Sequence, residues 1–245
     1  MLDSSLLPID GFYGERINLL YLRLIRKGNK GKEMKVLGGK TENGIVVGNT
    51  YDKYASKNPI VQRLMHGFEL NIDELVQKSD PKSINEVGCG EGYWTLRWIE
   101  KGLLARGCDF STLAIDSARK EADLRGLPTE AFNIKSIYEL TEGMDSADLI
   151  VCCEVLEHLE YPRQALKALQ NVTNNHLILS VPREPLWRLL NLARGKYFKH
   201  FGNTPGHIQQ WTKTCFLSIV SEFFDILDVR SPIPWTIILC SKKKI

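Results

Sequence analysis

The sequence lacks the features of a secreted, disulfide-bonded or membrane-spanning chain. Its six cysteines form no Cys-x-x-Cys pair and most lie in apolar runs, which favours buried free thiols in a reducing cytoplasm. No apolar run approaches the roughly 18–20 residues that span a bilayer. The start, Met-Leu-Asp-Ser-Ser, has no basic residue and no long apolar core, so we expect no secretory signal. A net charge of +3 is too small to indicate nucleic-acid binding by itself.

The composition fits one large α/β domain with an N-terminal extension. The chain has 245 residues, of which 43% are hydrophobic. Basic residues dominate 15–40, and apolar residues at helical spacing predict a basic amphipathic helix near 14–27. We therefore divide the chain into a basic arm (1–48) and a main domain (49–245). The arm is either a solvated, partly mobile segment or a surface-binding or lid element.

The main domain alternates short apolar runs with helical patterns. A first helix is expected over 49–78. Alternating strands and helices predict βαβ units and a mostly parallel sheet with right-handed crossovers. The last two strands are joined too closely for a parallel crossover, so one of them is reversed near an edge of the sheet. Expected strands are 83–87, 104–109, 130–134, 148–153, 176–181, 224–229 and 235–240; expected helices are 92–101, 111–125, 162–172 and 213–222.

A glycine loop follows the first of these strands. Alternating glycines allow a tight turn and close approach of a ligand to the backbone. The dinucleotide fingerprint needs a further glycine where Tyr93 stands, and the Lys-Ser/Thr pair of a phosphate loop is missing. A cofactor without a pyrophosphate therefore fits better than NAD or ATP. The loop reads Glu86-Val87-Gly88-Cys89-Gly90-Glu91-Gly92.

Two acidic residues indicate which cofactor this is. Glu86, at the start of the loop, would repel phosphate but can hold an ammonium group. Asp109 ends the next strand, where a carboxylate can accept both ribose hydroxyls, and Phe110 beside it can lie against a purine. An amino-acid end joined to a nucleoside is the structure of S-adenosylmethionine (SAM).

These segments resemble motifs of the class I SAM-dependent methyltransferases. The glycine loop is similar to motif I, Asp109-Phe110-Ser111 to motif II, and 148–159 to motif IV, in the family's order over about residues 50–240. The resemblance implies a seven-stranded Rossmann-like fold with a reversed last strand. It also implies that Glu86, Gly88 and Gly90 face the methionine end of SAM and Asp109 the ribose.

The resemblance assigns the rest of the cofactor site less directly. The family often has an acid near the adenine amine, and Ser136-Ile137 stand in its place here, so we expect backbone and hydroxyl contacts to adenine. Tyr51 and Tyr54 resemble N-terminal residues that close over the cofactor; packing at a helix start is the alternative.

An acidic and histidine-rich segment follows the fourth strand. In a helical turn, Glu154, Glu157 and His158 would share one face and could bind a divalent cation such as Mg²⁺, with His207 as a fourth ligand. The cluster resembles metal-dependent O-methyltransferases of ubiquinone biosynthesis and of small-RNA 3′ ends. Packing and substrate positioning are the alternative explanation. Without a metal, His158 or His207 is the candidate general base, and Glu154 is also a candidate contact of the cofactor.

An insertion over 183–206 follows the fifth strand. Its apolar helical face, with Trp187 and several basic residues, fits a lid over the active site, a dimer contact or a peripheral membrane contact, and we favour the lid. Trp211, together with Trp187, is expected to contact the substrate.

These observations leave three hypotheses for the function. The first is O-methylation of a small, hydrophobic or phenolic molecule. The second is RNA 2′-O-methylation, against which stands the absence of a separate RNA-binding module. The third is a SAM-binding partner protein without catalysis, against which stand the intact glycine loop and Asp109.

Overall fold

A computed structural model describes residues 36–42, 45–49 and 51–243, which belong to one compact unit over 35–245. The basic helix predicted near 14–27 lies outside the described residues. The division of the chain at residue 48 remains a prediction.

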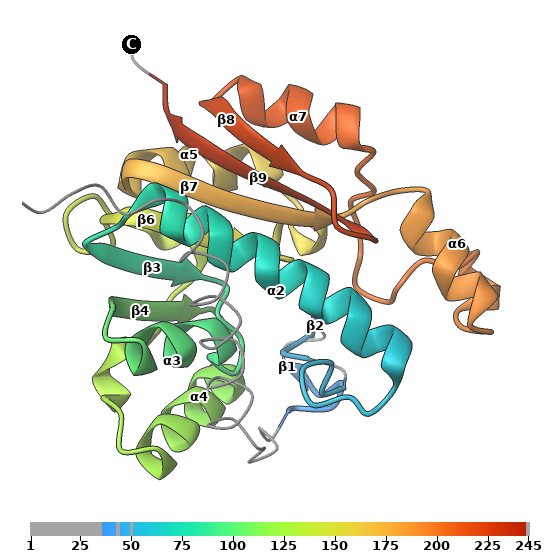
Figure 1. The fold of residues 1–245 in the computed structure, drawn as a ribbon, viewed down its shortest axis with the longest axis horizontal. Coiled ribbons are helices and arrows are strands. Elements are labelled where there is room, and N and C mark those ends of the chain that lie inside the picture. The colour runs from blue at the N-terminus through green and yellow to red at the C-terminus, as the bar shows by residue number, and fades with distance from the viewer. Residues whose placement is uncertain (1–35, 43–44, 50, 244–245) are drawn as a thin grey trace, which may run out of the picture. The chain divides into compact units, whose positions relative to one another are not determined.

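The core of the unit is a seven-stranded sheet in the order β5-β4-β3-β6-β7-β9-β8 (Figure 1). β9 pairs antiparallel with both β7 and β8, and the remaining neighbours pair in parallel. The predicted fold, a mostly parallel sheet with one reversed strand near an edge, is therefore confirmed. The strands are β3 (Ser83–Val87), β4 (Leu104–Asp109), β5 (Phe132–Ile134), β6 (Ala147–Cys153), β7 (Thr173–Pro182), β8 (Phe224–Arg230) and β9 (Trp235–Lys242).

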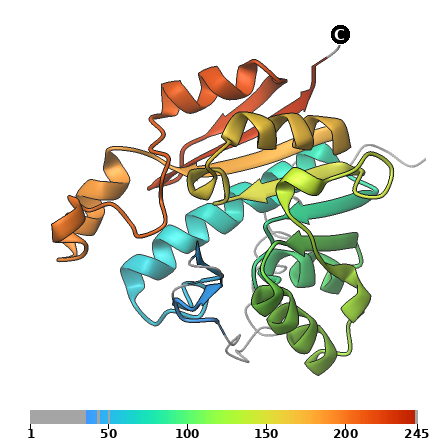
Figure 2. The same cartoon turned by 180° about the vertical axis from the view of Figure 1, so that it is seen from behind.

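Helices cover both faces of this sheet, as Figures 1 and 2 show from opposite sides. Buried side chains of α2 and α3 pack with one face, and those of α5 and α7 pack with the other. α4 packs against α3 and β5. None of the described helices is long and apolar enough to cross a membrane. The helices are α2 (Pro59–Ser79), α3 (Tyr93–Glu100), α4 (Thr112–Leu124), α5 (Pro162–Val172), α6 (Leu186–Ala193) and α7 (Lys213–Ser221).

The first described helix begins about ten residues later than the sequence pattern predicted. Pro59 is its first residue, and the side chain of Asn58 accepts a hydrogen bond of 2.9 Å from the N–H of Ile60. The residue before a proline is disfavoured from the helical region of φ/ψ space, so the pair Asn58-Pro59 sets the start of α2. The predicted start at 49 was wrong, since the apolar spacing was extended upstream past this signal.

The carboxyl ends of the parallel strands bring four segments together. The glycine loop follows β3, Asp109 ends β4, Glu154 follows β6, and the insertion follows β7. In an open α/β sheet, ligands bind at this edge. A short hairpin of β1 (Thr41–Glu42) and β2 (Ile45–Val46) precedes the sheet in sequence and pairs separately from it.

Candidate active site

Glycine is needed at the three alternating positions of the loop for different structural reasons. All have positive φ angles: 78° at Gly88, 52° at Gly90 and 84° at Gly92. A Cβ at Gly88 would lie 2.3 Å from a methyl carbon of Val155, and one at Gly92 would lie 2.7 Å from the Phe132 ring. A Cβ at Gly90 would meet nothing within 4 Å. Gly88 and Gly92 are therefore required by packing, whereas Gly90 faces the open space that a ligand can enter.

The carboxylate of Asp109 lies directly beside the glycine loop. One oxygen accepts a hydrogen bond of 3.0 Å from the N–H of Gly90, and the other accepts one of 2.9 Å from Ser111. Burial raises the pKa of Asp109. Phe110, the next residue, is 44% exposed and so leaves a ring free for contact with a base. Cys89 is buried beneath the loop, which leaves only its backbone for a ligand.

Glu86 has a role that the sequence did not reveal. Its buried carboxylate accepts hydrogen bonds from the N–H of Thr95 at 2.9 Å and from the Thr95 hydroxyl at 2.5 Å. Thr95 is in the first turn of α3, so the carboxylate caps that helix. Burial raises the pKa of Glu86 to about 8. Within the described residues, no hydrogen bond occupies Oε1, which leaves an acceptor for an ammonium group.

The residues expected near adenine are engaged within their own turn. The Ser136 hydroxyl accepts a hydrogen bond from the N–H of Tyr138 and caps the short helix Ile137–Glu139. The side chain of Ile137 is buried in the core. Contacts of these residues with adenine therefore remain a prediction.

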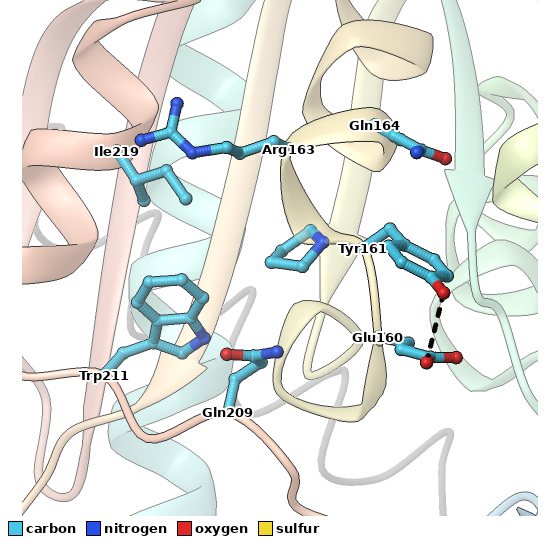
Figure 3. Close-up of a pocket in the computed structure, with 8 residues that line it drawn as sticks. Glu160, Tyr161, Arg163, Gln164, Gln209, Trp211 and Ile219 are labelled. Carbon is cyan, nitrogen blue, oxygen red and sulfur yellow. Dashed lines mark hydrogen bonds between the residues drawn. The ribbon is translucent and has the colours of Figure 1, made fainter.

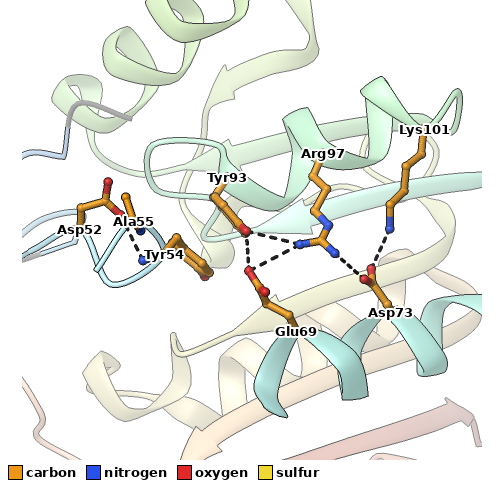
Figure 4. A network of polar contacts seen from close by, with 8 residues as sticks. All are labelled: Asp52, Tyr54, Ala55, Glu69, Asp73, Tyr93, Arg97 and Lys101. Atoms are coloured by element: carbon orange, nitrogen blue, oxygen red, sulfur yellow. Dashed lines mark hydrogen bonds and ion pairs between the residues drawn. The ribbon is translucent and has the colours of Figure 1, made fainter. Parts of the chain in front are cut away.

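The two tyrosines before α2 differ sharply. Tyr51 is 48% exposed, whereas Tyr54 stacks on Tyr93, with ring centroids 3.5 Å apart and planes inclined by 12°. Tyr93 directly follows the glycine loop, and its hydroxyl is hydrogen-bonded to Glu69 and to Arg97 (Figure 4). The structure thus brings Tyr54, but not Tyr51, into packing contact beside the loop.

Glu154 does not share a helical face with Glu157, as the sequence had suggested. Its φ angle is 59°, and the segment Leu156–His158 is a single 3-10 turn. The carboxylate of Glu154 accepts hydrogen bonds from the Ser180 hydroxyl at 3.0 Å and from the indole N–H of Trp235 at 2.7 Å. The predicted helical turn is therefore wrong, and Glu154 is turned toward β7 and β9.

Three of the four predicted metal ligands do lie together. One ligand atom each from Glu157, His158 and His207 can be chosen such that all lie within 4.8 Å of one another. Glu157 is 1% exposed, and neither of its carboxylate oxygens has a hydrogen-bond partner in the described structure. Nδ1 of His158 lies 2.9 Å from the carbonyl oxygen of Gly206. The backbone N–H groups of Ile208 and Gln209 both donate to the Glu157 carbonyl, which holds the segment after Gly206 against the turn.

Burial sets the ionisation of this cluster. It lowers the pKa of His207 to about 3 and also lowers that of His158. It raises the pKa of Glu157 well above its usual range. Both imidazoles are therefore neutral near pH 7, as metal ligands must be. A general base works best with a pKa near the operating pH, so His207 is better suited to binding than to proton transfer.

The two tryptophans predicted to contact substrate lie in different places. Trp187 stacks near His207, with centroids 6.0 Å apart, and its N–H donates to the Thr204 hydroxyl. Trp211 instead packs near Phe216 and borders a cavity of about 510 Å³ (Figure 3). That cavity is lined by Glu160, Tyr161, Pro162, Arg163, Gln164, Gln209, Trp211 and Ile219.

Sequence reasoning missed Glu91 and Lys53. Glu91, inside the glycine loop, is 1% exposed and accepts hydrogen bonds from Leu37 and Asn49. Burial raises the pKa of Glu154 and Glu157, and the positive charge of Lys53 partly opposes that rise in the pKa of each. The position of Glu91, a charged residue between two loop glycines, could have marked it as a residue with a specific partner. Nothing in the sequence pattern marked Lys53, because its position depends on tertiary folding.

Comparison with known proteins agrees with this geometry. Residues 85–176 match the family model described as a methyltransferase domain. The ubiquinone biosynthesis O-methyltransferase of Schizosaccharomyces pombe is 33% identical over 122 residues, which are 47% of this chain and 44% of that protein. The enzyme of the same name from Coxiella burnetii is 31% identical over 86 residues, 35% of this chain and 36% of that protein. The chain thus spans less than half the length of these relatives.

Solved structures share the fold. The magnesium protoporphyrin IX methyltransferase of Synechocystis PCC 6803 with bound SAH has a TM-score of 0.59 and 19% identity over 77% of this chain and 90% of that one. The methyltransferase domain of a bacterial Hen1 has a TM-score of 0.56 and 18% identity over 73% of this chain and 99% of that one. The resemblance read from the sequence is confirmed over residues 85–176, which match a methyltransferase domain, and the solved methyltransferases share the fold over 77% and 73% of this chain.

Proposed function

We propose that this protein is a SAM-dependent methyltransferase that methylates an oxygen of a small, phenolic or hydrophobic molecule. The observation that carries the proposal is the cluster of Glu157, His158 and His207 at the carboxyl edge of the sheet, where the glycine loop and Asp109 also lie. The names of the O-methyltransferase relatives support the class of acceptor.

The cofactor side of the proposal uses groups with matching chemistry. Gly90 leaves room beside the backbone, Asp109 offers two carboxylate oxygens to ribose hydroxyls, and Glu86 offers an acceptor to the ammonium group. Methyl transfer from a sulfonium needs alignment more than chemical assistance. The main task of these residues is therefore to fix the methyl group relative to the acceptor oxygen.

A divalent cation fits the acceptor side. Glu157 has two buried carboxylate oxygens without partners, and burial keeps the two neighbouring imidazoles neutral. Glu157, His158 and His207 would hold the ion, whereas Glu154 is already bonded to Ser180 and Trp235. When bound, such an ion lowers the pKa of a coordinated oxygen and so favours its methylation.

Calorimetry with S-adenosylhomocysteine (SAH), with NADH as the control, tests the cofactor. We expect micromolar or tighter binding of SAH and none of NADH. The acceptor class is tested by incubating the protein and methyl-labelled SAM with a cell extract, then separating small molecules, RNA and protein. Label in the small-molecule fraction supports the proposal, and label confined to RNA contradicts it.

A further inference from the structure

We propose that Glu91 is a positioning residue that fastens an N-terminal strap across the glycine loop and so slows the release of the cofactor. The strap consists of the described residues 36–42, 45–49 and 51–54. The inference rests on the proposed function, because it concerns retention of the same cofactor.

Glu91 forms its side-chain hydrogen bonds with the strap. Its Oε1 accepts from the backbone N–H of Leu37 at 3.1 Å and from that of Asn49 at 2.8 Å. Its Oε2 accepts from the side-chain amide of Asn49 at 2.8 Å. Because Glu91 stands between Gly90 and Gly92, these bonds join the strap directly to the loop that faces the cofactor.

The strap approaches Glu91 closely because residue 48 is glycine. Gly48 has a φ angle of 63°, and a Cβ there would lie 2.5 Å from Oε1 of Glu91. Backbone bonds hold the strap in the required shape: the N–H of Gly38 donates to Asn49, and that of Val47 donates to Lys40. The contact is thus formed by a folded hairpin and not by a single extended residue.

Two further contacts fix the strap on either side of Glu91. Oε2 of Glu42 accepts a hydrogen bond of 2.6 Å from the hydroxyl of Ser111, two residues after Asp109. At the other end of the strap, Tyr54 stacks on Tyr93 (Figure 4). The strap is therefore anchored beside both the ribose-binding acid and the glycine loop.

Apart from the stacked ring of Tyr54, the described contacts that hold the strap are mostly hydrogen bonds. Among its residues with described burial, Val47 is the buried apolar one, at 2% exposure. Segments with few buried apolar contacts open at a lower free energy than a core does. The strap can therefore open to admit the cofactor while the sheet stays folded, and Glu91 determines how firmly it closes again.

The test measures hydrogen exchange of residues 36–54 and the dissociation rate of SAH in three variants. Glu91→Ala removes all three acceptors, Glu91→Gln keeps a carbonyl oxygen for the two backbone donors, and Asn49→Ala removes one donor from the strap. Glu121→Gln is the matched control, because Glu121 is a buried acid paired with Arg125 on α4, away from these strap contacts. We expect Glu91→Ala to speed exchange in the strap but not in β3 and β6, and to speed SAH release about 10-fold.

The pattern of results separates the possibilities. SAH should dissociate from Glu91→Gln nearly as slowly as from the wild-type protein. The dissociation rate of Asn49→Ala should lie between those of Glu91→Gln and Glu91→Ala, and the control Glu121→Gln should match wild type. If Glu91→Ala does not fold, the Asn49→Ala result decides. Unchanged strap exchange and unchanged SAH release in a folded Glu91→Ala or Asn49→Ala variant would overturn the inference. Failure of the wild-type protein to bind SAH would instead overturn the proposed function. Faster hydrogen exchange of the strap in ligand-free Asn49→Ala would still show that Glu91 and Asn49 hold the strap on the loop.

Discussion

The carboxylate of Asp109 accepts a hydrogen bond of 3.0 Å from the backbone N–H of Gly90, so the end of β4 is tied to the middle of the glycine loop. Gly90 is also the loop glycine that faces open space. The acid that we propose to bind ribose therefore also orders the backbone of the glycine loop.

We expect Asp109→Ala to weaken SAH binding at least 100-fold. The substitution removes acceptors for two ribose hydroxyls together with the bond that orders the loop, and a hydrogen bond to a charged group contributes about 1.5–3 kcal/mol. Asp109→Asn, which keeps one oxygen, should lie in between. Calorimetry measures the affinity, and circular dichroism checks that each variant is folded. Full affinity in Asp109→Ala would refute the assignment of the cofactor site.

Binding of SAH should strengthen as the pH rises toward 8. The pKa of Glu86 is raised to about 8 by burial, so near pH 7 the free protein holds this group mostly protonated. An ammonium group needs the ionised carboxylate, so binding at pH 6–8 releases a proton. Each pH unit below the pKa then costs up to about 1.4 kcal/mol. Calorimetry in buffers of different ionisation enthalpy measures the proton release, which Glu86→Gln should abolish.

The raised pKa of Glu86 should make the free protein less stable as the pH rises, whereas it makes SAH binding stronger. A carboxyl whose pKa is raised by folding stabilises the folded state below its unfolded pKa and loses that contribution as the pH rises toward 8. Glu86→Gln should therefore unfold at a higher denaturant concentration than wild type at pH 8, and this advantage should shrink toward pH 5. A difference that is independent of pH would contradict the assigned ionisation.

Gly90→Ala and Gly92→Ala should fail for different reasons. A Cβ at Gly92 meets the Phe132 ring at 2.7 Å, so this variant should lose about 1–3 kcal/mol of stability by overpacking, besides the strain of its positive φ angle. A Cβ at Gly90 meets open space, so Gly90→Ala should cost only the backbone strain, about 1–2 kcal/mol, yet it should weaken SAH binding strongly. Chemical denaturation and calorimetry on both variants separate the two effects. Equal loss of stability would contradict the division between packing and ligand space.

Much of this architecture could be predicted from sequence because it is repetitive. The strands are apolar runs between helical patterns. Gly88, Gly90 and Asp109 can be recognised because each lies at or just after the end of such a strand. Glu154 shows the limit of that approach. Its spacing from Glu157 predicts a shared helical face, but a φ angle of 59° and bonds to Ser180 and Trp235 turn its carboxylate away. Those partners lie 26 and 81 residues away in sequence, so local spacing carries no information about them.

Metal binding should depend on Glu157 more than on Glu154. We expect Mg²⁺ or Mn²⁺ to bind the wild-type protein with release of a proton, because burial raises the pKa of Glu157 and a coordinating carboxylate must be ionised. Affinity should therefore rise with pH. Glu157→Gln and His207→Ala should each weaken binding at least 10-fold, whereas Glu154→Gln should have a smaller effect. Calorimetry with the metal alone gives the affinities. A dominant effect of Glu154→Gln would mean that the cluster rearranges on binding.

Besides the lid favoured from the sequence, with which it is compatible, we expect the insertion around α6 to contact anionic membranes. Leu189, Phe198 and Phe201 are 59%, 64% and 74% exposed, and the segment also carries Arg188, Arg194, Lys196 and Lys199. Exposed apolar side chains among cations suit the interface of an anionic bilayer. We expect sedimentation with phosphatidylglycerol vesicles and little with neutral ones, and at least a 10-fold loss in Phe198→Ser/Phe201→Ser.

Leu104→Ser provides the matched control for that experiment. Leu104 is 73% exposed, but it begins β4, at the opposite end of the strand from Asp109. It should therefore leave vesicle binding unchanged. If the phenylalanine variant instead kept its vesicle binding and raised the KM for the acceptor, the insertion would act as a lid. In that case Phe198 and Phe201 would be exposed here because they pack only when an acceptor is bound. The insertion is already linked to the acceptor cluster, because Trp187 stacks near His207.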